Sequence, residues 1–324
     1  MPDIITTRTV HVQHRSSPKN VATLLYRFGC TPEFRGHSDE TSRQFRRIAK
    51  RLAEKFGKLS IAELERPEFR ALVYDWRDEM AETPAECEKT IRTLARCVSW
   101  GVDRGFVRYN RIEAIRFPWR NSRPRADIVW TPREICAIRP HLGPLAAAFE
   151  LSLWTGLRQG DVLHATQRCL DGEWLRLVPA KTQSRTALTL HLPYALLAPL
   201  RVLLNGLRDP GRELLLPETW HERTFRRLFT RVKIRAGLGE RDRHWHDLRG
   251  TLATWLFEAG CTQPEAGAIL GHAPGERTTR RYAAQSRVYA KHAFRKLDAY
   301  MREHLAGFYG AATAAAHAAI SRPK

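Results

Sequence analysis

The sequence has few cysteines, few acidic residues for its size, and no long apolar segment. Its six cysteines are scattered and form no C-x-x-C pair, so neither a zinc knuckle nor a disulfide framework is supported. No apolar run approaches the roughly 18 residues that a membrane span needs. The chain also lacks G-x-S-x-G, H-E-x-x-H and P-loop motifs, which argues against an unrelated hydrolase. With no signal peptide in view, these absences predict a cytoplasmic protein that has reduced thiols and no membrane partner.

The shortage of acidic residues leaves the chain strongly basic. Its 54 Lys and Arg residues against 34 Asp and Glu residues give a formal charge of +20 and a pI near 10.3. Such an excess indicates a polyanionic partner, with nucleic acid favoured over a membrane surface. An apolar fraction of 43% in 324 residues is ordinary for globular proteins and is enough for two domains, each with its own core.

The N-terminal part of the chain divides into an arm and a helical domain. Residues 1–37 are polar and irregular and predict a flexible arm. Residues 38–116 carry apolar side chains at helical spacing and predict a helical domain. Basic residues recur on two of its helices with few acidic neighbours, so we expect them to contact DNA phosphates. They are Arg43, Arg46, Arg47, Lys50, Arg51, Lys89, Arg92 and Arg96.

The pattern changes after residue 116. Residues 117–130 contain two prolines and three arginines and have the composition of a basic linker. Residues 131–300 predict a second domain, mainly helical, in which two strand-like runs in 174–193 flank a polar turn. Residues 301–324 are Ala-rich and predict a C-terminal tail that is either helical or frayed. The fold class expected is mainly α with a small β-sheet.

The side chains best suited to chemistry gather in residues 244–282. His246 and Arg249 are three residues apart and share one face if the segment is helical. A Leu-Gly-His segment ends at His272, and Tyr282 follows ten residues later. Imidazoles, a guanidinium and a phenol together can hold a phosphodiester, stabilise the charge of its transition state and supply an oxygen nucleophile.

This stretch resembles the signature of the tyrosine recombinases, the phage integrase family. In that family the order is H-x-L-R, a helix, L-G-H and then the nucleophilic Tyr. The upstream segment TGLRQGDVL is similar to the family's T-G-x-R-x-x-E-L, with Asp161 where Glu is usual. The resemblance implies that Arg158 is the first catalytic Arg and that Lys181, in the predicted hairpin, protonates the leaving 5′ oxygen. The implied catalytic set is Arg158, Lys181, His246, Arg249, His272 and Tyr282.

Three positions have alternatives near them. Arg185 could act in place of Lys181. His244 could replace His246, although only His246 lies three residues before Arg249. Tyr289 could replace Tyr282, although Tyr282 lies at the family distance from the Leu-Gly-His segment.

The resemblance also implies a reaction and its partners. The family has a helical N-terminal core-binding domain and a mixed α/β catalytic domain. Attack by the Tyr yields a 3′-phosphotyrosyl bond and a free 5′ hydroxyl, with no metal, cofactor or ATP. We therefore expect a site-specific recombinase, an integrase of a mobile element, acting on double-stranded DNA. Four protomers would act on two duplexes, each protomer being a monomer or dimer when free, and accessory DNA-bending proteins are further candidate partners.

Two other functions fit the same residues. One is a relaxing enzyme similar to type IB topoisomerases, which uses the same nucleophile without exchanging partners. The other is a non-catalytic DNA-binding protein on the same fold. Recombinant junctions distinguish the recombinase from an enzyme that yields relaxed circles alone.

Overall fold

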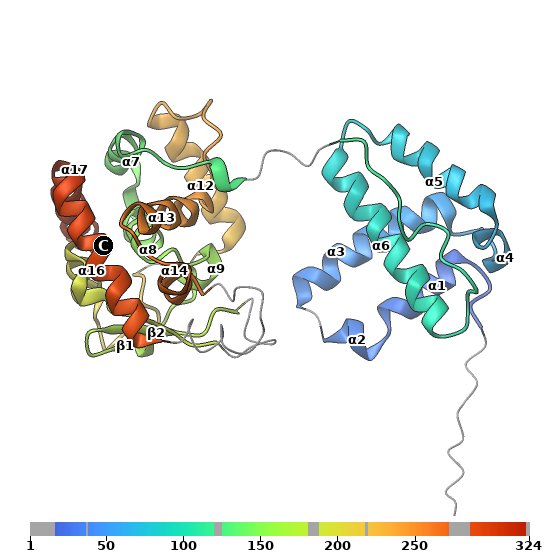
Figure 1. The fold of residues 1–324 in the computed structure, drawn as a ribbon, viewed down its shortest axis with the longest axis horizontal. Coiled ribbons are helices and arrows are strands. Elements are labelled where there is room, and N and C mark those ends of the chain that lie inside the picture. The colour runs from blue at the N-terminus through green and yellow to red at the C-terminus, as the bar shows by residue number, and fades with distance from the viewer. Residues whose placement is uncertain are drawn as a thin grey trace, which may run out of the picture. The chain divides into compact units, whose positions relative to one another are not determined.

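The computed structural model describes residues 17–36, 38–119, 125–180, 188–217, 220–271 and 286–321. The chain divides into two compact units, Met1–Arg123 and Pro124–Lys324, each with its own hydrophobic core (Figure 1). Most of the described chain is helical and one small sheet is present, which confirms the predicted fold class. None of the described helices is both long and apolar enough to cross a membrane.

The N-terminal unit is a helical bundle. Its helices are α1 (Val21–Gly29), α2 (Pro32–Arg35), α3 (Asp39–Phe56), α4 (Ile61–Leu64), α5 (Pro67–Glu79) and α6 (Pro84–Asp103). Their starts follow local chemistry, because Ser38 and Ser60 cap the free N–H groups of α3 and α4 while α5 and α6 begin with proline. The apolar faces of these helices meet in one core.

The prediction of a flexible arm over residues 1–37 is corrected for its second half. Residues 21–35 form α1 and α2, and Val21, Leu24 and Phe28 are buried in the core of the N-terminal unit. Asn20 starts α1 with a capping box to Thr23. The apolar side chains of α1 repeat at helical spacing, but the helix has only nine residues and depends on packing for its stability. Residues 1–16 and 37 lie outside the described residues.

Four of the eight basic residues expected to contact phosphates have acidic partners, contrary to the sequence-based expectation. Arg43 pairs with Glu40 and Arg92 with Glu88, within their own helices. Arg47 and Arg51 of α3 both pair with Glu86 of α6, a neighbour that no local pattern reveals. These arginines are exposed, and exposed pairs contribute only about 0–1 kcal/mol, so a phosphate can replace the carboxylate at small cost.

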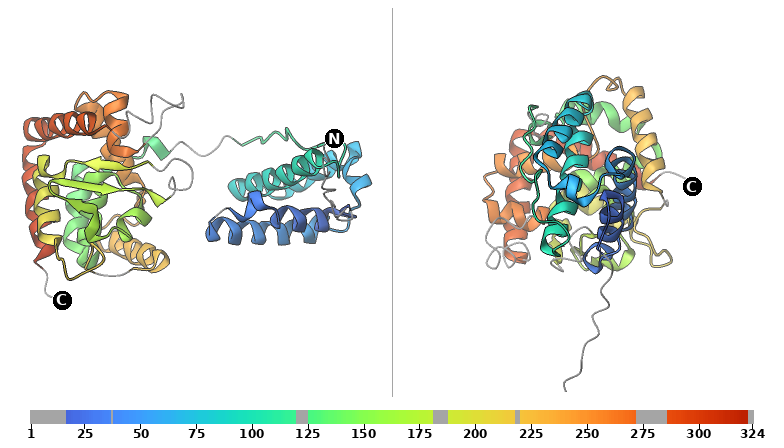
Figure 2. Two further views of the ribbon diagram at one scale, coloured as in Figure 1. Left: turned by 90° about the horizontal axis from the view of Figure 1, so that it is seen from below. Right: turned by 90° about the vertical axis from the view of Figure 1, so that its right-hand side faces the viewer.

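The C-terminal unit is a group of helices with one three-stranded antiparallel sheet at one face (Figure 2). The strands are β1 (Leu170–Asp171), β2 (Trp174–Leu177) and β3 (Leu190–Leu192), with Leu175 opposite Leu192 in the register of β2 and β3. The helices are α7 (Pro132–Ile138), α8 (Ala146–Thr155), α9 (Gln159–Leu163), α11 (Ala198–Leu207), α12 (Glu222–Arg235), α13 (Asp247–Glu258), α14 (Gln263–Leu270), α16 (Arg287–His304) and α17 (Ala306–Ile320). Through β3 the sheet contacts α14 and α16.

Helix α8 is the centre of this unit, because every one of its residues is buried. A helix that is apolar all round belongs inside a core. Its one acidic residue, Glu150, accepts hydrogen bonds from Arg139 Nε at 2.8 Å and from Trp154 Nε1 at 3.0 Å. The charge is therefore paired inside the core, and α8 leads directly into residues 156–158 of the candidate site.

Residues 301–324 were predicted as a C-terminal tail, and the described part of this range, residues 301–321, is part of the fold. Helix α16 continues to His304, and α17 packs against α8 and α11. Phe308 and Tyr309 are buried, and the Tyr309 hydroxyl accepts from Ala198 N and donates to Asp298. Ala-rich helices present a smooth face, so α17 approaches α11 closely at Gly206, where a side chain would overlap Ile320. Residues 322–324 lie outside the described residues.

Candidate active site

Arg249 is the centre of the candidate site. It lies on α13 and is 7% exposed. Its Nη1 donates to the carbonyl oxygen of Gly156 at 2.7 Å, and its Nη2 donates to the carbonyl oxygen of Leu270. These carbonyls lie at the C-terminal ends of α8 and α14. One guanidinium therefore joins three helices at one point.

Two glycines make this junction possible. Gly156 and Gly271 end α8 and α14 with φ of +63° and +65°, a left-handed conformation that favours glycine. At Gly156 space is also short, because an added Cβ would lie 2.7 Å from Leu270 Cδ2. The turn that brings α8 to Arg158 thus requires glycine for two reasons, conformation and close packing.

Replacing Gly156 with Ala is expected to destabilise the C-terminal unit by about 2–3 kcal/mol. The left-handed conformation costs an L-residue about 1–2 kcal/mol, and displacement of Leu270 adds to it. Urea unfolding would measure the change. Gly172→Ala is the matched control, since Gly172 has φ +58° but nothing within 4 Å of an added Cβ. Equal losses in the two variants would show that the contact with Leu270 is unimportant.

Arg158 brings a second positive charge close to Arg249. It is half-buried at the N-cap of α9. Burial lowers the pKa of Arg249 to about 10, the charge of Arg158 lowers it as well, and Asp161 raises it. No carboxylate among the described residues forms an ion pair with Arg249. Two neighbouring guanidiniums, one of them buried on neutral carbonyls, form a site that a bound anion would stabilise.

Asp161, which stands where the family has Glu, holds the chain next to Lys181. Its Oδ1 accepts from the backbone N–H of Ala180 at 2.9 Å. Its buried Oδ2 has no hydrogen-bond partner among the described residues. Asp161 and Ala180 line a cavity of about 710 Å³, together with Arg168 and Arg176. Lys181 and its alternative Arg185 lie outside the described residues.

His246 lies at the start of the helix that carries Arg249. It is exposed at the N-cap of α13, and its carbonyl accepts the backbone N–H of Arg249 at 3.2 Å, so the two residues lie within one turn. The alternative His244 is exposed, and its Nε2 lies 3.3 Å from Asp242 Oδ1. Three of the six predicted residues, Arg158, His246 and Arg249, are thus described. His272 and Tyr282 lie outside the described residues, as does Lys181.

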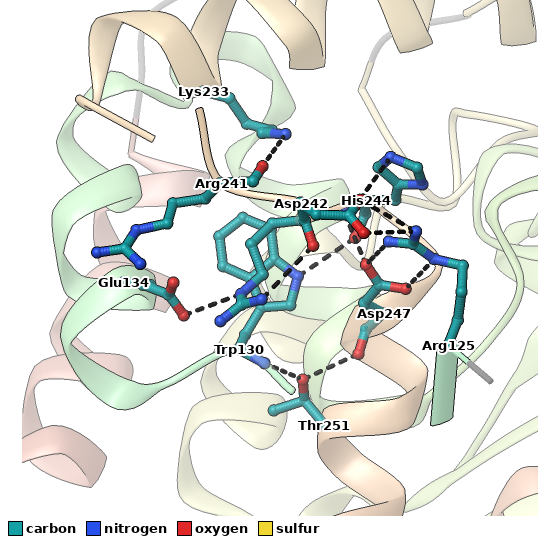
Figure 3. A network of polar contacts seen from close by, with 10 residues as sticks. Arg125, Trp130, Glu134, Lys233, Arg241, Asp242, His244, Asp247 and Thr251 are labelled. Carbon is teal, nitrogen blue, oxygen red and sulfur yellow. Dashed lines mark hydrogen bonds and ion pairs between the residues drawn. The ribbon is translucent and has the colours of Figure 1, made fainter. Parts of the chain in front are cut away.

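Asp247 and the residues around it were missed as part of the site (Figure 3). Asp247 is 2% exposed, and its Oδ2 accepts the backbone N–H of His244 at 2.7 Å. Arg125 donates to both carboxylate oxygens of Asp247. Residues 125–130, predicted as part of a linker, therefore belong to the C-terminal unit. In the sequence, the only indication of this contact was the presence of an acidic residue, Asp247, within H-D-L-R.

An ion pair between the buried Glu265 and the partly exposed Lys296 joins α14 to α16, the helices on either side of residues 272–285. Glu265 accepts from Lys296 Nζ at 2.8 Å and from the backbone N–H of Thr262 at 2.7 Å. Burial alone would raise the pKa of Glu265, but the hydrogen bonds from Lys296 and Thr262 outweigh it and lower that pKa. The pair therefore holds α14 against α16, the two helices between which the predicted His272 and Tyr282 lie in sequence.

The lowered pKa of Glu265 gives a pH dependence. A carboxyl whose pKa is lower in the folded state contributes stability above its unfolded value of 4.5, and this stability is lost as the pH falls below it. Lys296→Met should therefore reduce the free energy of unfolding at pH 7 and reduce it less at about pH 3, because the contribution of the ionised carboxylate declines as the pH falls from 4.5 toward the lower folded pKa of Glu265. Urea unfolding at both pH values measures this, with Arg295→Gln, an exposed position on α16, as control. A loss with Lys296→Met that is independent of pH would contradict the assignment.

Comparison with known proteins adds to this geometry. Residues 133–287 match the model of the phage integrase family, a range that includes all six predicted residues. The chain is similar to lambda integrase (residues 75–356) bound to DNA, with TM-score 0.63 and 20% identity over 81% of this chain and 95% of that chain. It is also similar to a lambda integrase tetramer bound to a Holliday junction, with TM-score 0.66 and 19% identity over 80% of this chain and 79% of that chain.

A third similar structure is the Tn1549 transposon integrase (residues 82–397) in complex with circular intermediate DNA. Its TM-score is 0.55, with 15% identity over 85% of this chain and 98% of that chain. Comparison of the sequence with curated proteins finds no match. At these identities the structural likeness establishes the fold, and the match to the family model is confined to residues 133–287.

Proposed function

We propose, because residues 133–287 match the model of the phage integrase family, that this chain is a site-specific DNA recombinase of the tyrosine recombinase class. It cuts and rejoins DNA strands for the integration or excision of a mobile element. The observation that carries this proposal is the pair of guanidiniums at the junction of α8, α13 and α14. Arg249 is buried there on neutral carbonyls, with Arg158 close by.

A scissile phosphate suits this pair of guanidiniums. Each guanidinium presents a planar fork that matches two oxygens of a phosphate. The phosphate would supply the negative charge that the partners of Arg249 lack, and its non-bridging oxygens gain negative character as the phosphorus is attacked. Arg158 and Arg249 therefore stabilise the transition state more than the ground state, which is the condition for catalysis.

The remaining predicted residues supply the nucleophile and the proton transfers. The phenol oxygen of Tyr282 forms a bond to phosphorus while the bond from phosphorus to the 5′ oxygen breaks. His246 and His272 hydrogen-bond to the phosphate or accept the phenol proton, and Lys181 gives a proton to the leaving 5′ oxygen. The phosphotyrosyl bond keeps the energy of the broken bond, so a 5′ hydroxyl from a second duplex reverses the step without ATP.

The partners follow from the same proposal. The protein acts on double-stranded DNA in the cytoplasm, with four protomers on two duplexes. Lambda integrase, to which this chain is similar, forms a tetramer on a Holliday junction, which supports this arrangement. When free of DNA the protein is a monomer or dimer, and accessory DNA-bending proteins assist assembly. The basic charge of +20 supports tight, salt-dependent association with DNA.

The proposal is tested by trapping the covalent intermediate. The protein is incubated, without metal or ATP, with nicked duplexes tiled from the DNA that flanks its own gene. We expect a protein–DNA adduct on denaturing gels, whose modified peptide contains Tyr282, and recombinant junctions when two reactive duplexes are supplied. Relaxed circles without junctions would instead indicate a topoisomerase. Binding to these duplexes without any adduct would indicate a non-catalytic DNA-binding protein.

A further inference from the structure

Residues 125–130, here called the strap, contact the start of α13 and the residues before it through Arg125 and Trp130 (Figure 3). At one end, Arg125 donates to Asp247 through Nε at 3.0 Å and Nη2 at 2.6 Å. At the other end, the backbone N–H of Trp130 donates to Thr251 Oγ1 at 2.9 Å, and the indole Nε1 donates to the carbonyl of His244 at 3.2 Å. The strap thus contacts His244, which precedes His246 in sequence, and Thr251, which follows Arg249.

The contact with Arg125 matters because Asp247 is a buried carboxylate that needs a charged partner. The Asp247 side chain is almost fully buried at the first residue of α13. Besides Arg125, the backbone N–H of His244 donates to it. A buried carboxylate deprived of its charged partner has to move toward water or become protonated. Without Arg125, the first turn of α13 and the residues on it would therefore shift.

The guanidinium of Arg125 is also fully engaged within the protein. Its Nη1 donates to both carboxylate oxygens of the exposed Asp242, at 3.1 and 3.2 Å. All three of its nitrogens thus contact carboxylates of the C-terminal unit. An arginine held in this way suits an internal positioning role better than contact with a DNA phosphate.

We propose that Arg125 is a positioning residue for strand cleavage, which acts through Asp247 to fix the first turn of α13 and so places His246 and Arg249 against the scissile phosphate. The inference rests on the proposed function. Arg125 does not touch the reacting atoms. It lies where the chain enters the C-terminal unit, so the first described residue of that unit already controls the geometry of the site.

The test compares Arg125→Gln, Asp247→Asn and the double variant in single-turnover adduct formation on a reactive nicked duplex. We expect each single variant to lower the rate constant about 10- to 100-fold, since small misplacements of catalytic groups have effects of this size. The double variant should be no slower than the slower single variant, because both remove one interaction. The final yield of adduct and the affinity for DNA should stay within about two-fold of wild type.

Two controls remove neighbouring charges without breaking the Arg125–Asp247 contact. Asp242→Asn removes the exposed partner of Arg125, and Arg241→Gln removes an exposed guanidinium from the same region (Figure 3). Both should react within about two-fold of the wild-type rate. The yield separates positioning from misfolding, because a partly unfolded preparation loses yield at an unchanged rate constant. Arg125→Lys, which keeps the charge but not the two-point contact, serves if Arg125→Gln does not fold.

Four results would overturn the inference. The first is a wild-type rate constant for Arg125→Gln, or for Arg125→Lys where that variant replaces it. The second is a double variant whose rate constant is lowered by the product of the two single-variant factors. The third is weaker DNA binding with a shallower salt dependence at an unchanged rate constant, which would make Arg125 a phosphate contact. The fourth is a wild-type protein that forms no adduct, and only this result also removes the proposed function.

Discussion

Replacing Tyr282 with Phe is expected to abolish the covalent protein–DNA adduct. Phenylalanine lacks the oxygen that would bond to phosphorus, so the reaction has no nucleophile of the required kind. Loss of a nucleophile from a complete site typically costs about 10⁴-fold or more in rate, which here means no adduct on a denaturing gel. DNA affinity should change by less than about two-fold, because the phosphate-binding guanidiniums remain.

The matched control is Tyr289→Phe. Tyr289 carries the same hydroxyl, lies in the first turn of α16 and is 39% exposed, so its replacement by Phe should be tolerated. Adduct formation should continue in this variant, and mass spectrometry of the wild-type adduct should locate the DNA on the peptide that contains Tyr282. An adduct that persists in Tyr282→Phe and disappears in Tyr289→Phe would move the nucleophile to Tyr289.

Replacing Arg249 with Lys is expected to lower both catalysis and stability. A lysine ammonium keeps the charge, but it cannot satisfy the carbonyls of Gly156 and Leu270 and also present a planar fork to a phosphate. Removal of one such donor costs about 10²- to 10³-fold in rate. The unsatisfied buried carbonyls should lower the free energy of unfolding by about 1–3 kcal/mol. Single-turnover cleavage and urea unfolding measure the two effects separately.

Arg158→Lys separates the loss of cleavage rate expected for Arg249→Lys from the loss of folding stability. Arg158 is half-buried, and within the described part of the chain its side chain forms no hydrogen bond to α8 or α14. We expect a rate loss similar to that of Arg249→Lys, with a change in the free energy of unfolding below about 0.5 kcal/mol. If Arg249→Lys cleaved DNA at the wild-type rate, the guanidinium junction would be structural only, and the phosphate site would have to lie elsewhere.

Much of the fold follows from local signals in the sequence. Capping residues and prolines mark the starts of α3, α5, α6 and α7, and the apolar composition of α8 predicts a buried helix. Helix α1 was missed because its nine residues lie in a polar segment and gain stability from α3 and α6. The sequence left open whether the segment that forms α17 is helical or frayed, because its Ala-rich composition does not indicate that it packs against α11.

Residues of the candidate site could be predicted from the sequence only where they lie within a recognisable motif. The resemblance carried by H-x-L-R and by the segment around Arg158 implied two guanidiniums near one phosphate, and the structure brings Arg158 and Arg249 close together. The contact between Arg125 and Asp247 spans 122 positions in the chain, and no periodicity or local motif reports such a pair. Nor could spacing show that Arg249 is buried on the backbone carbonyls of Gly156 and Leu270, because that depends on how three helices meet.

The two hydrophobic cores share no residue, and the chain divides between Arg123 and Pro124. Domains with separate cores contribute to stability largely independently, so a gene fusion at this boundary leaves both cores intact. Under the proposed function, exchange of the N-terminal unit with that of a related recombinase would give a chimera that keeps its chemistry but has new contacts to DNA. Target choice and strand cleavage could in this way be inherited separately.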